Sequence, residues 1–122
     1  MLKAIKFASI PVTDQDRALK FYTESLGLKI LTDRPFDDKQ RWIELEIPGA
    51  ETNVVLFTAE GQEAMIGSFS NIVFCCDKID KTHEELSARG VEFLHPPKKE
   101  DWGSFTIFKD PDGNQFCLSA KK

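Results

Sequence analysis

Apolar and polar residues follow the same succession of patterns twice along the chain. In the first half, a β-branched apolar segment at residues 4–12 predicts a strand. Apolar residues at helical spacing within residues 14–27 predict a helix that Asp14 caps and Gly27 ends. Turn-forming residues then separate three further predicted strands, at residues 28–31, 41–47 and 53–58.

The second half repeats this order after a linker predicted at residues 59–68. A strand is predicted at residues 69–76, and Asp77 opens a helix that Gly90 ends. Three more strands are predicted at residues 91–94, 105–109 and 115–119, the last two joined by the turn sequence Asp-Pro-Asp-Gly-Asn. The sequence therefore predicts a single domain of two βαβββ modules, at about residues 1–58 and 69–122.

Composition and charge narrow the class of protein. The chain has 122 residues, of which 41% are hydrophobic and 30% charged, which is typical of one globular domain. The net charge is −4, with lysines and acids interspersed, so we expect no nucleic-acid partner. No apolar run approaches the roughly 18 residues of a spanning helix, so we expect no membrane partner. The N-terminal segment lacks the apolar core of a signal peptide, and we expect a cytoplasmic location.

The three cysteines also favour a cytoplasmic location. They are Cys75, Cys76 and Cys117, and an odd number with an adjacent pair makes a poor disulfide framework. Neighbouring residues on a strand face opposite sides, so Cys75 and Cys76 could not hold one ion together. A reducing environment is the simplest interpretation.

Two segments of the chain resemble a known family. VTDQDRALKFYTESLGLKIL is similar to the first helix of the glyoxalase/bleomycin resistance protein/extradiol dioxygenase group, the vicinal oxygen chelate (VOC) superfamily. VEFLHPP followed by FKDPDGNQFCL resembles its C-terminal signature. The resemblance implies an α+β fold in which the two βαβββ modules form a cupped, partly closed mixed sheet with the helices outside. It also implies a homodimer, because many members dimerise.

The resemblance also indicates where a metal would be bound. Metal-dependent members carry a His or Gln, a Glu, a His and a Glu on the first and last strands of the two halves. The matching positions in this chain are Phe7, Leu56, Asn71 and Cys117. Phenylalanine and leucine cannot coordinate an ion, and one amide oxygen with one thiolate is a poor ligand set. We therefore expect no metal and no cofactor, with His83 on the solvent side of its helix and His95 in a loop.

Strand alternation predicts which side chains line the cup. Ile10 and Val12 should pack on the helix if Phe7 and Ser9 face inward. The predicted lining, where a small organic ligand would bind, comprises Phe7, Ser9, Trp42, Glu44, Leu56, Asn71, Trp102, Gln115 and Cys117, with Arg41 at the rim. Each of these residues also has a structural interpretation. The two tryptophans could pack a core or an interface, Glu44 could be a solvated or ion-paired carboxylate, and Cys117 could be an inert buried thiol rather than a nucleophile.

The residues favour a binding protein over an enzyme. An apolar cup without metal ligands predicts a small-molecule binding protein, similar to the drug-sequestering bleomycin resistance branch of the family. One alternative is a metal-dependent lyase or isomerase, like lactoylglutathione lyase, or a dioxygenase whose ligands lie in another register. A second alternative is a partner-binding domain with no small ligand.

Overall fold

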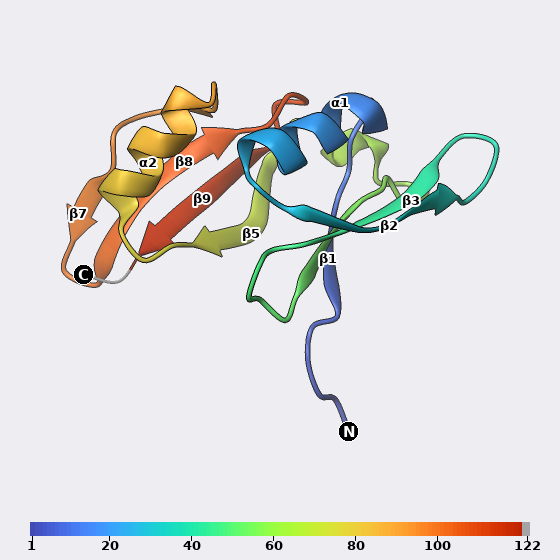
Figure 1. Cartoon of the computed structure of the whole chain (residues 1–122), viewed down its shortest axis with the longest axis horizontal. Coiled ribbons are helices and arrows are strands. Elements are labelled where there is room, and N and C mark those ends of the chain that lie inside the picture. The colour runs from blue at the N-terminus through green and yellow to red at the C-terminus, as the bar shows by residue number, and fades with distance from the viewer. Residues whose placement is uncertain (121–122) are drawn as a thin grey trace. The chain divides into compact units, whose positions relative to one another are not determined.

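The computed structural model describes residues 1–120, and its contacts divide the chain into two compact units, Met1–Ile66 and Gly67–Lys122. Each unit is built on its own mixed sheet with one main helix (Figure 1). The predicted α+β class is thereby confirmed. Among the described residues, no helix is long and apolar enough to cross a membrane.

The first unit is a four-stranded sheet with parallel pairing at one end. Its strands lie in the order β1-β4-β3-β2, with β1 parallel to β4 and the other neighbours antiparallel. The elements are β1 (Phe7–Ile10), α1 (Gln15–Lys20), the π-helical turn η1 (Phe21–Ser25), β2 (Lys29–Pro35), β3 (Arg41–Glu46), β4 (Asn53–Leu56) and the 3-10 turn η2 (Glu63–Met65).

The first helix begins where the sequence predicts but changes its winding. Asp14 is the N-cap, and its carboxylate accepts a hydrogen bond from the backbone N–H of Arg17 at 3.0 Å. After Lys20 the helix widens into a π turn, in which the N–H of Leu26 donates to the carbonyl of Phe21 at 3.1 Å. Gly27 then takes a positive φ of 81°, which ends the helix.

Most of the core of the first unit lies on one face of the sheet. Five side chains at alternating positions of β1, β3 and β4 are at most 2% exposed: Ile10, Ile43, Leu45, Val54 and Leu56. Ala18 and Tyr22 of the helical segment are fully buried as well. The apolar side chains at every second position of the strands thus pack against the apolar side of the helix, as the sequence pattern predicts.

The second unit repeats the arrangement with one additional strand. Its order is β5-β9-β8-β6, with β5 parallel to β9, and β7 also pairs with β8. Figure 1 shows α2 lying over β8 and β9 of this sheet. The elements are β5 (Phe69–Cys75), α2 (Ile79–Ala88), β6 (Glu92–Phe93), β7 (Lys98–Glu100), β8 (Gly103–Lys109) and β9 (Gln115–Ala120).

Two details of the second unit differ from the sequence prediction. The strand predicted at residues 91–94 is followed by a second, unpredicted one, because after Pro96 and Pro97 the chain pairs with β8 again as β7. The hydroxyl of Thr106 in β8 donates to the carbonyl of His95 at 2.8 Å, so the segment between β6 and β7 is bonded to the sheet. The helix α2 begins at Ile79 with Lys78 as its N-cap, so it starts two residues later than Asp77 predicts.

Candidate functional site

Four aromatic rings gather in the first unit. The ring of Trp42 lies 5.4 Å from Phe7, 5.2 Å from Phe57 and 6.1 Å from Phe36, measured between centroids. Phe36 and Phe57 also contact each other edge to face at 4.8 Å. These separations are those of interacting aromatic pairs. We call Phe7, Phe36, Trp42 and Phe57, together with Glu44, the aromatic face.

Strand register explains why these residues share one side of the sheet. Phe7 pairs with Asn53, and both Ser9 and Glu44 pair with Val55, so their side chains lie on the same face. This is the face opposite the helix-packed core described above. The prediction that Phe7, Ser9, Trp42 and Glu44 share one face of the sheet agrees with this strand pairing.

The carboxylate of Glu44 is held in a fixed orientation on this face. The Nε1–H of Trp42 donates to its Oε1 at 3.3 Å, and the Nδ2–H of Asn53 donates to its Oε2 at 2.7 Å. Each oxygen therefore receives one donor from a neutral side chain. A carboxylate accepts about four hydrogen bonds, so acceptor positions remain for a further partner.

The prediction that Leu56 lines this face is wrong. Leu56 pairs with Ile10 and is fully buried, so its side chain belongs to the core on the helix side. The parallel pairing of β4 with β1 sets this register, and it brings Asn53 and Val55 to the aromatic side instead. Val55 is therefore the residue of β4 that faces the same way as Phe7 and Ser9.

Sequence reasoning missed three residues of the aromatic side: Phe36, Asn53 and Phe57. Alternation along β4 could have identified Asn53 and Phe57, which stand two residues on either side of Val55. No sequence signal indicates Phe36, because it follows β2 in the connection to β3 and reaches Trp42 only through the fold of that hairpin. Phe36 is 60% exposed, so its ring is open to solvent.

Arg41, predicted at a rim, is fully engaged by acids. Its Nε donates to Asp33 at 3.0 Å and its Nη1 to Asp16 at 2.7 Å. The hydrogen bond to Asp33, and then that to Asp16, raises the pKa of the Arg41 guanidinium. Its charge is thus neutralised within the unit. It borders a polar groove of about 880 Å³ beside the start of α1, which Val12, Gln15, Gln40 and Thr58 also line.

Three predicted residues of the second unit share the open face of its sheet. Asn71 lies on the same side of β5 as Val73, which is 59% exposed, and Val73 pairs with Cys117. Gln115 pairs with Phe69 on that side. Burial raises the pKa of the Cys117 thiol, which opposes its use as a nucleophile at neutral pH.

Trp102 reaches the same face of the sheet through Phe105, which pairs with Ser119 two residues along β9 from Cys117. It occupies the turn between β7 and β8, is 63% exposed, and stacks on Phe105 with centroids 5.8 Å apart. The predicted lining residues therefore fall into one group in each unit, with Leu56 excluded. A single cup lined by both groups stays a prediction.

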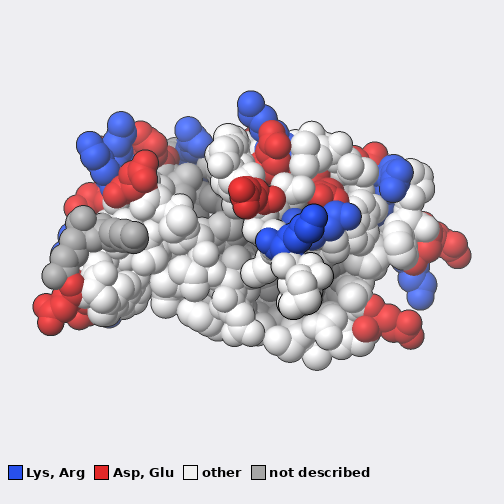
Figure 2. Space-filling view, turned by 90° about the horizontal axis from the view of Figure 1, so that it is seen from below, with Lys and Arg blue, Asp and Glu red and all other residues white. Residues whose placement is uncertain are grey.

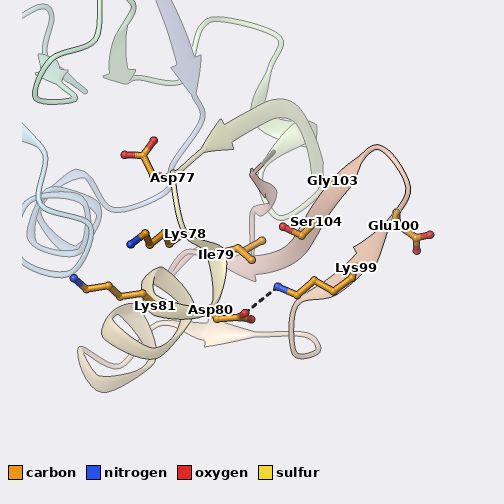
Figure 3. A pocket seen from close by; sticks show the side chains of 9 residues that line it. All are labelled: Asp77, Lys78, Ile79, Asp80, Lys81, Lys99, Glu100, Gly103 and Ser104. Carbon is orange, nitrogen blue, oxygen red and sulfur yellow. Dashed lines mark hydrogen bonds and ion pairs between the residues drawn. The ribbon is translucent and has the colours of Figure 1, made fainter. Parts of the chain in front are cut away.

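A groove of about 800 Å³ lies beside the start of α2 in the second unit. Figure 3 shows Lys99 reaching Asp80, a hydrogen bond of 2.9 Å. Three lysines and three acids line this groove, so it favours neither sign of ligand charge; they are Lys78, Lys81, Lys99, Asp77, Asp80 and Glu100.

Residues 1–120 contain no group of three or more His, Cys, Asp or Glu side chains arranged to hold a metal ion. The ring of His83 lies 4.4 Å from Phe93, so it packs between α2 and β6 instead of facing solvent as predicted. His95 contacts Phe105 and lies beside the carbonyl of Pro96, in the predicted loop. All three cysteines are free.

The surface charges do not form a patch of one sign on the side drawn in Figure 2. There, the basic and acidic side chains of the described residues lie close to one another, with uncharged atoms between them. This distribution agrees with the interspersed charges of the sequence.

Comparisons with known proteins place the chain in a family. The family model described as "Glyoxalase/Bleomycin resistance protein/Dioxygenase superfamily" matches residues 4–118. The uncharacterized protein YetH of Bacillus subtilis is 40% identical over 121 residues, covering 97% of this chain and 98% of YetH. A probable chloroplastic lactoylglutathione lyase of Arabidopsis thaliana is 32% identical over 114 residues, or 88% of this chain and 33% of that protein.

A solved structure agrees with the family model. TnmS3, an antibiotic binding protein from Streptomyces sp. CB03234, superimposes with a TM-score of 0.87 at 32% identity, over 99% of this chain and 98% of TnmS3. The chain therefore belongs to the glyoxalase/bleomycin resistance protein/dioxygenase superfamily.

Proposed function

We propose that this protein binds a small organic molecule with a flat ring system on the aromatic face, without a metal ion. The observation that carries the proposal is the position of Trp42, whose ring contacts three other rings while its N–H is fixed to Glu44. Such a surface combines a large apolar area with an oriented polar group, which is the composition of small-molecule sites.

Exposure of the rings supports a binding role over pure core packing. Most of the apolar core of the first unit lies on the other face of the sheet, and Val55 is the fully buried residue of β4 on the aromatic face. Phe36 nevertheless remains 60% exposed at the edge of the cluster. A cluster of partly exposed aromatic side chains is a typical site for a ligand or partner.

The residues at the family's metal positions disfavour the lyase and dioxygenase alternative. After the register of β4 is corrected, these positions hold Phe7, Val55, Asn71 and Cys117. Two of the four cannot coordinate, and the other two form no recognised ligand set. The antibiotic-binding role of TnmS3 agrees with a binding role for this chain. We propose in addition that the protein is a homodimer that acts in the cytoplasm.

The proposal can be tested with Trp42 as the reporter. In a Trp102→Phe background Trp42 is the single tryptophan, and its emission should change saturably as quinoline, N-methylquinolinium or 1-naphthalenesulfonate is added. Phe36→Ala should weaken binding of any probe that saturates by about tenfold, because it removes one exposed ring of the cluster. Leu94→Ala, which truncates an exposed apolar residue of the second unit, is the matched control and should leave the affinity unchanged.

Two outcomes would contradict the proposal. If none of the three probes gives saturable binding, the aromatic face has no affinity for flat ring systems. If Phe36→Ala and Leu94→Ala change the affinity equally, the probes bind to apolar surface in general.

A further inference from the structure

We infer that the ligand of the aromatic face is a cation, for which the carboxylate of Glu44 supplies the counter-charge. This inference rests on the proposed function and adds the chemical class of the ligand: a flat aromatic ring that carries a positive charge or a charged N–H group.

The negative charge of Glu44 is not balanced by a basic side chain. Its two hydrogen-bond partners, Trp42 and Asn53, are neutral donors, and no ion pair joins Glu44 to a base within residues 1–120. Asp16 and Asp33 of the same unit differ in this respect, because both bind Arg41. The unit thus compensates those two carboxylates and leaves that of Glu44 available.

The basic residue nearest to Glu44 on the neighbouring strand does not neutralise its carboxylate. Arg34 of β2 stands opposite Trp42, while Glu44 itself stands opposite the neutral Thr32. Arg34 makes no ion pair with Glu44, although both belong to the same side of the sheet. The carboxylate therefore stays available to a cation that arrives with a ligand.

The position of Glu44 among aromatic rings favours a cation that is itself aromatic. The carboxylate oxygen Oε1 lies 3.3 Å from the indole nitrogen of Trp42, so a group that binds this oxygen also reaches the indole. Aromatic faces attract cations, and tryptophan does so most strongly among the side chains. A flat cation would stack on the rings and bind the carboxylate at the same time, whereas an anion would be repelled.

The fixed orientation of the Glu44 carboxylate favours a ligand that carries an N–H group. Trp42 and Asn53 each use one acceptor position on different oxygens, so the group cannot rotate freely. Its remaining acceptor positions have a defined direction, and binding a ligand N–H there costs less side-chain entropy than ordering a mobile glutamate would.

The test compares probes of similar size and different charge. In the Trp102→Phe protein and a mildly alkaline buffer, quinoline is neutral and N-methylquinolinium is a cation of nearly the same shape. We expect the cation to bind about tenfold more tightly or better, and 1-naphthalenesulfonate to bind most weakly. Glu44→Gln keeps one acceptor oxygen, and so one of the two donor contacts, but removes the charge. It should therefore abolish the preference for the cation, which is measured as the ratio of the affinities for N-methylquinolinium and quinoline in the same variant.

Glu46→Gln is the matched control. Glu46 lies two residues along β3 on the same side and stands opposite Lys29, so its loss should change the preference little. Rising ionic strength should weaken binding of N-methylquinolinium to the parent protein and leave that of quinoline unaffected. This second measurement keeps the test valid if Glu44→Gln does not fold.

The outcomes separate the inference from the proposed function. Equal affinity for the two quinoline probes, or an equal effect of Glu44→Gln and Glu46→Gln, would overturn the inference while ring binding itself still holds. An absence of binding by every probe would overturn the proposed function, and the inference with it.

Discussion

The side chain of Gln15 and the backbone of Arg41 form two reciprocal hydrogen bonds across the first unit. Oε1 of Gln15 accepts the N–H of Arg41 at 2.9 Å, and Nε2 donates to the carbonyl of Arg41 at 2.8 Å. The same Nε2 donates to the carbonyl of Leu56 at 2.8 Å. The first residue of α1 is thereby bonded to the first residue of β3 and the last residue of β4.

Gln15→Ala should destabilise the protein by about 1–3 kcal/mol, because partly buried backbone groups of two strands lose their partner. Urea unfolding followed by circular dichroism would measure the change. Gln62→Ala is a control of the same chemistry, since Gln62 is exposed and the hydrogen bonds it makes, to Ala59 and from Met65, involve its backbone alone. Indistinguishable unfolding midpoints for the two variants would show that the Gln15 hydrogen bonds make no net contribution to the free energy of unfolding.

Thr58→Val should also lower the free energy of unfolding, by about 1–3 kcal/mol. The hydroxyl of Thr58 accepts from the N–H of Val12 and donates to its carbonyl, both at 2.9 Å, in a buried position. Valine keeps the shape but leaves both backbone groups without this partner. Thr52→Val, which removes an exposed bond to the carbonyl of Ile5, should cost less, and a reversed order in thermal unfolding would refute the argument.

The three thiols should differ in reactivity. Burial raises the pKa of Cys76 and of Cys117, so their thiolate forms appear at more alkaline pH than that of an ordinary thiol. Cys75 is exposed. With a thiol-specific reagent at neutral pH we expect one fast and two slow sites, and the slow phases should accelerate as pH rises through the raised pKa values. Cys75→Ser should remove the fast phase, and its survival in that variant would show that the assignment is incorrect.

Purified protein should retain far less than one equivalent of Ni, Zn, Mn or Fe after exposure to each ion and dialysis. The physical reason is the side-chain chemistry of Phe7, Val55, Asn71 and Cys117. Elemental analysis of untagged protein prepared without chelator would test this. A retained equivalent would instead favour the lyase or dioxygenase alternative, with ligands outside the predicted positions.

Residue patterns alone predicted the order of the main helices and strands, except β7, and the two faces of β3. In β3, Ile43 and Leu45 face one side of the sheet and Trp42 and Glu44 face the other. This alternation follows from the strand backbone itself, so it can be predicted without knowing the neighbouring strands. The cap at Asp14 is equally local. The resemblance to the family came from such local segments, and the family match over residues 4–118 confirms it.

The features that sequence missed depend on pairing between distant segments. The face of Leu56 is set by its parallel partner Ile10, and β7 exists because the chain after the prolines meets β8 again. Phe36 joins the aromatic face through the geometry of a hairpin. No periodicity within a short segment encodes these relationships, so the candidate site was only partly predictable.

In each unit, the strand that comes first in the chain pairs with the strand that comes last: β1 with β4, and β5 with β9. During synthesis β1 therefore emerges long before its partner, and it must wait for closure of a loop that spans most of the unit. Non-local pairing of this kind slows folding compared with contacts between neighbouring segments. A nascent or truncated chain that stops before Asn53 leaves β1 as an unpaired edge, exposed to proteases and to other unfolded chains.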